Sequence, residues 1–267
     1  MPLLRIQIYQ PQAHYRIPFS YQRRLTYPLP PYSTVLGFLC NVCGINDQRN
    51  ELYKRGIQEL KIGISGQFRC KLTENLWFRN MSLEAHKNTY NVVQNRLKNG
   101  QIGHIGGQSP IKIDVLQDVE LTIYLYHRDF KYLHIIYEHL KNPVNRLGVL
   151  HLGRSEDWII YKNIALLNDE SIEYKRRDGN YHNFFWIPQQ MYYIDNAHNQ
   201  TRWDSFDGVY YKLTTFSRIE NYEFHYNNTG KRQYETIFAK LSDGKILNNY
   251  CYFDKELQLP VFLWGNI

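Results

Sequence analysis

The sequence predicts an α+β fold, on three observations. Apolar residues alternate with period two in short stretches along the whole chain, as they do in half-buried strands. Two apolar stretches have helical spacing instead, and both lie before residue 168. Aromatic residues make up 15% of the 267 residues, and Tyr and Phe favour strands. An apolar content of 43% is typical of a folded chain and excludes a mainly disordered one.

The first elements follow directly from this pattern. Residues 2–10 alternate and predict a strand, whereas residues 11–32 hold five prolines, which exclude a helix or a central strand there. Ser33 or Thr34 suits the N-cap of a helix that continues to Cys43. Residues 60–69 alternate again and predict the next strand.

A long polar insertion comes next. Residues 80–109 are rich in Asn, Gln and Gly, and a loop of this length inside a domain is usually functional or disordered. We expect the flanking residues to pair as a protruding β-hairpin, a thumb over about 70–115. Residues 119–126 and 158–167 predict strands, and the helical spacing from Phe130 to Leu140 predicts a helix between them.

These elements occur in the order β-α-β, insertion, β-α-β. This is the order of the ferredoxin-like superfold, which RRM-type RNA-binding domains share. We therefore predict a ferredoxin-like domain over residues 1–167. Beyond it, residues 168–267 predict a β-rich C-terminal lobe, whose hairpin turns we place at four dipeptides: Asp178-Gly179, Asp207-Gly208, Thr229-Gly230 and Asp243-Gly244.

Several classes of protein are excluded or disfavoured. No stretch approaches the ~18 consecutive apolar residues of a membrane helix, and the N-terminus does not resemble a signal peptide, so we expect a cytoplasmic protein with no membrane partner. Four cysteines make no disulfide scaffold, and Cys40 and Cys43 form a single CxxC pair on an apolar helix. We expect neither a metal nor a cofactor.

The net charge of +7 and the mixture of Arg with aromatic residues point toward RNA, because cations bind phosphates and flat rings stack on bases. The proline-rich loop supplies Tyr15, Arg16, Arg23, Arg24 and Tyr27. The alternative for this loop is a solvated segment whose tyrosines pack on the core.

Two further segments are candidates. Ser33 and Thr34 at the helix start would favour phosphate, and a glycine-punctuated stretch, residues 146–155, offers Arg146, His151 and Arg154. The alternative for that stretch is a plain turn before a strand.

Catalysis has weaker support. The ten His residues are scattered, without an HExxH motif or a pair at metal-ligand spacing. Metal-free RNA cleavage would need a His, Tyr or Lys near a 2′-hydroxyl, and four His residues are candidates: His14, His86, His104 and His151. Each is explained more simply as a surface or packing residue.

Three segments closely resemble the Cas five family of CRISPR-associated proteins, in the RAMP superfamily. They are residues 18–39 (PFSYQRRLTYPLPPYSTVLGFL), 109–124 (SPIKIDVLQDVELTIY) and 151–157 (HLGRSED). They occur in the family's order within residues 3–165, and the style is most similar to type I-B. The C-terminal hundred residues add little to the resemblance.

The resemblance implies an RRM-like fold with a thumb and a place in Cascade, the type I surveillance complex that serves antiviral defence. There the family caps the 5′ end of the CRISPR RNA and holds its repeat-derived 5′ handle. The implied partners are this RNA, the Cas seven family backbone subunit, the Cas eight family large subunit and, indirectly, the target DNA. Thumb residues that would contact the RNA are His86, Lys87, Asn88 and Gln108.

Our leading hypothesis is a non-catalytic cap. Two others remain open. In type I-C the family member is itself a metal-independent endoribonuclease that processes precursor CRISPR RNA, but its Tyr, Lys and His do not align with positions in this sequence. The chain would otherwise be a protein scaffold without direct RNA contact.

Overall fold

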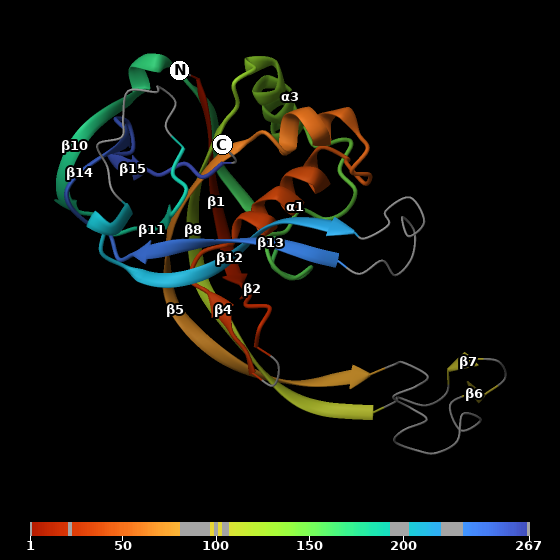
Figure 1. Cartoon of the computed structure of the whole chain (residues 1–267). Coiled ribbons are helices and arrows are strands. Elements are labelled where there is room, and N and C mark those ends of the chain that lie inside the picture. The colour runs from red at the N-terminus through yellow and green to blue at the C-terminus, as the bar shows by residue number, and fades with distance from the viewer. Residues whose placement is uncertain are drawn as a thin grey trace.

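The structure is a computed structural model that describes residues 2–20, 23–80, 97–98, 101–102, 107–192, 203–219 and 232–265. It is an α+β protein whose sheets are mostly antiparallel, which confirms the fold class (Figure 1). Seven strands of the main sheet lie in the order β12-β13-β11-β5-β8-β1-β9, and β3 pairs with β8 beside them. No helix in the described ranges is long and apolar enough to cross a membrane.

The first half of the chain supplies both long helices and most of the main sheet. Its strands are β1 (Leu3–Ala13), β2 (Tyr15–Arg16), β3 (Arg23–Arg24), β4 (Thr26–Tyr27), β5 (Lys61–Asn80), β6 (Leu97–Lys98), β7 (Gln101–Ile102), β8 (Gly107–Tyr126) and β9 (Ile160–Leu167). Its helices are α1 (Tyr32–Val42) and α3 (Phe130–Lys141), with a π-helical turn at Leu52–Ile57. The predicted order β-α-β-β-α-β is formed by β1, α1, β5, β8, α3 and β9.

The second half adds strands and two short 3-10 turns. The strands are β10 (Ile172–Asn180), β11 (Phe184–Pro188), β12 (Val209–Ile219), β13 (Arg232–Ser242), β14 (Lys245–Asp254) and β15 (Leu259–Val261), and the turns are Asp169–Ser171 and Trp203–Ser205. Strands β11, β13 and β12 continue the main sheet, since β11 pairs with β5 at Phe184↔Gly66 and Phe185↔Ser65. Strands β10, β14 and β15 form a separate sheet. The main sheet therefore crosses the predicted domain boundary at residue 167.

Helices α1 and α3 bury one apolar stripe each. Six residues of α1 and three of α3, among them Leu39 and Leu133, are buried in a cluster that also contains Leu4, Ile6 and Ile8 of β1. Their spacing of three and four residues places them on one helical face, and the alternation in β1 does the same for the strand. These local patterns made both helices predictable, and the bounds of α3 are confirmed.

Strands β5 and β8 continue beyond the sheet as a paired hairpin, which we call the arm (residues 70–80 and 107–117). It extends away from the body of the molecule (Figure 1). The pairing runs from Cys70↔Gln117 to Asn80↔Gly107, so the predicted hairpin forms. The short strand β3 pairs in parallel with β8 here, with Arg24 opposite Ile113. The proline-rich loop is thereby fixed to the base of the arm.

Some local predictions are wrong. Helix α1 begins at Tyr32 with Pro31 as its N-cap, so Ser33 and Thr34 lie inside the first turn. Asp178-Gly179 lies within β10, and Asp243-Gly244 connects strands of two different sheets, so neither makes a hairpin turn. Turn residues predict a change of direction, whereas the pairing of the flanking strands depends on distant contacts. Asp207-Gly208 directly precedes β12, and Thr229-Gly230 lies outside the described residues.

Candidate nucleic-acid interface

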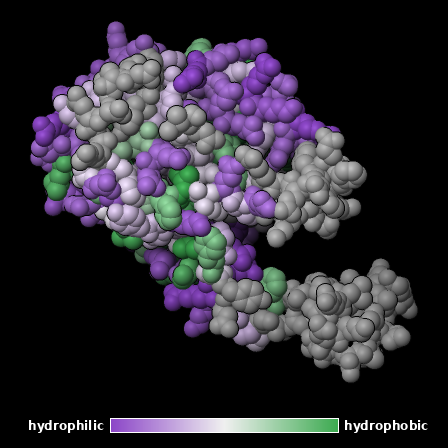
Figure 2. Space-filling view, in the orientation of Figure 1, coloured by the Kyte–Doolittle hydropathy of each residue, from purple (hydrophilic) through white to green (hydrophobic). Residues whose placement is uncertain are grey.

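A cavity of about 540 Å³ lies where the arm leaves the body; we call it the arginine cavity. Elements from both halves of the chain line it, and its lining residues are His14, Arg16, Pro18, Arg24, Pro31, Ser33, Thr34, Ile113, Gly153, Arg154, Thr214 and Tyr234. Five residues predicted as sites therefore meet in one cavity: Arg16, Arg24, Ser33, Thr34 and Arg154. Figure 2 shows apolar residues exposed among polar ones at the start of the arm.

Two arginines reach the arginine cavity because of strand alternation. Successive side chains of a strand point to opposite faces. Tyr15 in β2 points into the core, so Arg16 points outward, where it is exposed. In β3, Arg23 points toward Asp114, while Arg24 points toward the cavity and lies 5.0 Å from the ring centre of Phe78.

The charges of Arg16 and Arg24 have no ion-pair partner among the described residues. Partial burial, and then the charge of Arg16, lower the pKa of Arg24 from its ordinary value. Two like charges held close together without a counter-ion repel each other, and an anion between them would remove that cost. This arrangement favours a phosphate group.

The start of α1 adds a second source of positive potential. Pro31 provides no side-chain cap, and the first turn contains no acidic residue. The exposed N–H groups and the helix dipole at such a terminus favour anions. The hydroxyls of Ser33 and Thr214 lie 2.6 Å apart and join α1 to β12. The helix start is thereby held against the cavity.

Arg154 lies in the arginine cavity with its charge already balanced. Its guanidinium lies 2.8 Å from Asp157, 3.4 Å from Glu156 and 3.5 Å from Glu74. Asp157 is fully buried and also accepts hydrogen bonds from the backbone N–H groups of Arg154 and His14. We interpret Arg154 as a residue that positions the loop, because three carboxylates compete with any phosphate.

The glycine-punctuated loop needs Gly153 at this place. Its φ is +107°, and a Cβ there would lie 2.8 Å from Asp157 Oδ2 and 2.8 Å from the carbonyl oxygen of His14. Only glycine allows both this backbone conformation and this close approach. The loop is therefore packed directly against the chain that carries His14.

His14 is the most distinctive polar group of the arginine cavity, and it was not among our predicted RNA-binding residues. Its side chain is 3% exposed, and Nδ1 lies 2.7 Å from the carbonyl oxygen of Asp114. Nε2 has no hydrogen-bond partner among the residues the structure describes. Burial is the main cause of a lowered pKa, to which the charges of Arg154 and Arg16 add, while the Asp114 hydrogen bond and Asp157 oppose it. His14 is therefore neutral at pH 7.

Arg23 lies outside the arginine cavity. Its guanidinium is 3.0 Å from Asp114, which also contacts Lys71 at 3.3 Å and accepts a hydrogen bond from Thr73 at 2.9 Å. Burial raises the pKa of Asp114, but these hydrogen bonds and charges outweigh it and lower the pKa overall. Asp114 thus stays ionised and ties the base of the arm together.

Tyr15 and Tyr27 require a correction, because they are core residues and offer no ring face for a base. Tyr15 is 0% exposed and donates to Gln10 Oε1. Tyr27 is 1% exposed, donates to the carbonyl oxygen of Lys212 at 2.7 Å and packs edge-on against Trp186. The alternative interpretation, tyrosines packed on the core, is therefore correct for both.

The remaining predicted residues lie elsewhere. Arg146 is exposed and donates to the carbonyl oxygen of Pro143 at 3.2 Å. His151 lines a separate cavity of about 480 Å³ with Leu147 and Gly148. Gln108 is in β8, but its side chain is outside the description, as are residues His86, Lys87 and Asn88 entirely. For these residues an RNA contact stays a prediction.

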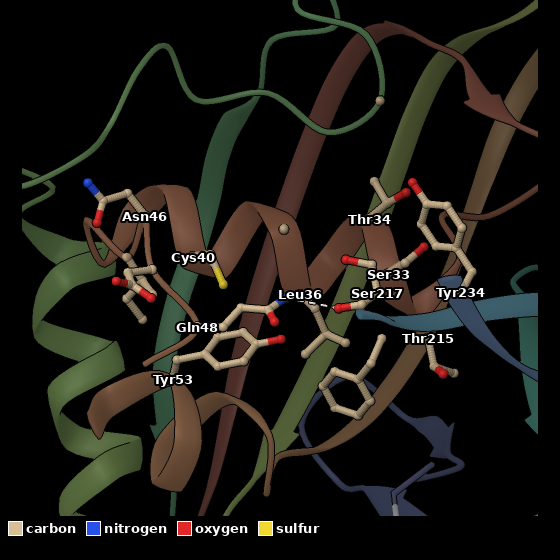
Figure 3. A pocket seen from close by; sticks show the side chains of 15 residues that line it. Ser33, Thr34, Leu36, Cys40, Asn46, Gln48, Tyr53, Thr215, Ser217 and Tyr234 are labelled. Carbon is tan, nitrogen blue, oxygen red and sulfur yellow. Dashed lines mark hydrogen bonds between the residues drawn. The ribbon is translucent and has the colours of Figure 1, made fainter. Parts of the chain in front are cut away.

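A second cavity of about 560 Å³ continues from the first along α1 (Figure 3). Ser33, Thr34, Gly153 and Tyr234 line both cavities. The ring of Tyr234, from β13, is 51% exposed (BUR), and such a ring can stack on a base. No local signal marks this Tyr among the 23 of the chain, because only the pairing of β12 with β13 brings it to α1.

The fold and the site define an α+β protein with a cationic cavity at the base of a β-hairpin arm. Residues 3–161, more than half of the chain, match the family described as CRISPR-associated protein (Cas_Cas5). The chain therefore belongs to this family of CRISPR-associated proteins. No curated protein matches it.

Solved structures show similarity in fold. A chain of a CRISPR RNA-guided surveillance complex is 12% identical, with a TM-score of 0.53 and coverage of 92% of this chain and 91% of that one. A CRISPR protein from Archaeoglobus fulgidus is 9% identical over the full length of both chains, with a TM-score of 0.42. A chain of the Type III-B Cmr-beta complex bound to cognate target RNA is 11% identical, with a TM-score of 0.39 and coverage of 91% and 84%.

Proposed function

We propose that this chain is a CRISPR RNA-binding subunit of a type I Cascade complex, where it caps the 5′ end and holds the repeat-derived handle without cleaving it. The observation that carries the proposal is the arginine cavity. Arg16, Arg24 and the uncapped start of α1 face one space and have no described counter-ion. The backbone of a single-stranded RNA supplies the missing negative charge.

The strand order supports an RNA-binding domain of the ferredoxin-like, RRM type. Strands β5-β8-β1-β9 lie side by side, and β1 is antiparallel to both of its neighbours. Helices α1 and α3 pack on these strands. In this interpretation residues 1–167 form the domain, the arm is the thumb inserted in it, and residues 168–267 are an added β-rich part.

Family membership and fold similarity to a surveillance-complex chain support assembly with other subunits. The partners that we propose are the Cas seven family backbone subunit and the Cas eight family large subunit, with target DNA bound indirectly through the guide RNA. The exposed apolar residues Leu72, Leu76 and Trp77 on the arm suit contacts within such an assembly.

The test is an electrophoretic mobility shift with labelled repeat RNA from the protein's own locus, in EDTA, over a series of salt concentrations. We expect the Arg16→Ala/Arg24→Ala variant to bind RNA about 10- to 100-fold more weakly. Its salt slope should be smaller by roughly 1.4, at ~0.7 for each lost phosphate contact.

The matched control is Arg55→Ala/Arg176→Ala, which removes the same charge at exposed positions away from the arginine cavity. This control should keep the slope of the unaltered protein. Equal affinity and equal slope for both double variants would refute the proposed function and favour the protein scaffold without RNA contact.

A second candidate function is a metal-independent endoribonuclease, and His14 is the observation that favours it. A neutral imidazole whose Nε2 is unpartnered among the described residues can act as a general base. Site-specific cleavage of the repeat RNA in EDTA, lost in His14→Asn, would replace the non-catalytic proposal.

A further inference from the structure

The hydrogen bond of His14 fixes which atom of its ring carries the proton. A carbonyl oxygen can only accept, so at 2.7 Å from the carbonyl oxygen of Asp114, Nδ1 must donate. In the neutral ring the proton is then on Nδ1, and Nε2 presents a lone pair. Buried Nε2 is therefore an acceptor without a described donor.

Such a group costs free energy unless a ligand supplies the donor. Buried polar atoms in native proteins almost always have a hydrogen-bond partner, and an exception needs a specific explanation. His14 lines the arginine cavity together with Arg16 and Arg24, which are donors and cations. A phosphate oxygen can accept from the arginines but cannot donate to Nε2. The ligand must therefore offer an anion and a hydrogen-bond donor within one cavity.

A ribonucleotide has this combination in its backbone, because the 2′-hydroxyl lies within one sugar of the phosphate. We propose that Nε2 of His14 accepts a hydrogen bond from the ribose 2′-hydroxyl of a nucleotide whose phosphate lies at Arg16 and Arg24. The inference rests on the proposed function and makes His14 the residue that distinguishes RNA from DNA at this position.

A base is a less suitable donor here. Its amino or imino group is separated from the phosphate by the sugar, and only some bases offer a donor at a given edge. The second cavity, with the exposed ring of Tyr234, continues from the first and offers the base a separate place (Figure 3). Sugar and phosphate can then lie in the arginine cavity.

The experiment is a deoxy scan of the repeat-derived handle RNA, in which a single nucleotide at a time carries 2′-deoxy, and affinity is measured in EDTA. We expect one position at which the deoxy substitution weakens binding by the unaltered protein about 10-fold. A 2′-fluoro group, which cannot donate, should weaken binding there to a similar extent. Changing the base at the same position should have little effect.

The variant His14→Asn completes a double-mutant cycle. Asn can donate from Nδ2 to the carbonyl oxygen of Asp114 but has no atom at the place of Nε2. We expect His14→Asn to bind all-ribose RNA about 10-fold more weakly and to show no further loss on deoxy substitution at the sensitive position. Continued sensitivity of the variant at that position would overturn the assignment to His14.

The scan on the unaltered protein decides the matter even if the variant does not fold. Arginine-dependent binding without a sensitive 2′ position overturns this inference alone, whereas absence of arginine-dependent binding overturns the proposed function. Sensitivity to the base but not to the sugar also overturns the inference. Cleavage at the sensitive nucleotide, blocked by 2′-deoxy, would support the hydroxyl contact and replace the non-catalytic function.

Discussion

Strand β1 joins two polar clusters that differ in how their charges are balanced. Near its start, Arg5 is 1% exposed and both terminal nitrogens are paired, with Asp254 at 2.8 Å and Glu256 at 2.9 Å. Tyr124 also donates to Asp254, at 2.9 Å. We call these four residues the clasp, because they join β1 and β8 to the end of β14.

The chain that follows β1 leads to the arginine cavity, where the balance is the opposite. Arg16 and Arg24 lack described counter-ions, and Nε2 of His14 lacks a described donor. A buried charge whose partners come from the same chain contributes to the fold, whereas unmatched groups around a cavity indicate a ligand. The comparison predicts that changes to the clasp affect stability and changes to the cavity affect RNA binding.

The largest effect is expected from Asp254→Ala in the clasp. The change leaves Arg5 buried beside a single, exposed carboxylate, so we expect a loss of about 3–5 kcal/mol in the free energy of unfolding. Denaturant unfolding measures it. Glu256→Gln is the control, since Glu256 is 62% exposed, and it should cost less than about 1 kcal/mol. Equal effects of the two variants would contradict the description of the clasp.

The next effect joins the two properties. Gly153→Ala places a Cβ against Asp157 and the backbone of His14 at a positive φ, so we expect a loss of about 2 kcal/mol in stability together with weaker RNA binding. In the same loop, Gly148→Ala meets no atom within 4 Å and serves as the matched control. Thermal unfolding and the mobility shift should both separate these variants.

A pair of tyrosine variants tests the correction made for the proline-rich loop. Tyr27→Phe removes a hydrogen bond to Lys212, so it should cost about 1 kcal/mol of stability and leave RNA affinity unchanged. Tyr234→Ala should leave stability within about 0.5 kcal/mol and weaken RNA binding about 5- to 10-fold. The exposed Tyr210 lies outside both cavities, and Tyr210→Ala should not weaken binding. A reversed pattern for Tyr27 and Tyr234 would contradict the assignment.

The smallest effect is a pH dependence of stability. The folded protein lowers the pKa of His14, mainly through burial, so the unfolded chain binds the proton more readily. Stability should therefore be constant above the ordinary pKa of 6.5 and fall as the pH decreases below it. Arg154 and Arg16 disfavour the charged ring, while Asp157 and the Asp114 carbonyl favour it. The measurement is the free energy of unfolding of the unaltered protein minus that of His14→Asn between pH 5 and 7.5 (~two units around this value). A difference that grows below pH 6.5 in favour of the unaltered protein would contradict the sign.

The sequence alone determined what depends on near neighbours along the chain. Period-two alternation and helical spacing predicted the β-α-β-β-α-β order, helix α3 and the paired flanks of the insertion. The mixture of Arg with helix-start residues located Arg16, Arg24, Ser33 and Thr34, which do meet in one cavity. Local backbone preferences and side-chain patterning are sufficient for such predictions.

Only the tertiary structure decided which polar groups remain unmatched. The partner of Arg23, Asp114, lies 91 residues away, and the residue that holds the backbone of His14, Asp157, lies 143 residues away. Whether Tyr15 is buried and whether Tyr234 faces α1 likewise depend on strand pairing between distant segments. The physical reason is that charge balance and burial are properties of neighbours in space, and the separation of those neighbours along the chain leaves no local pattern.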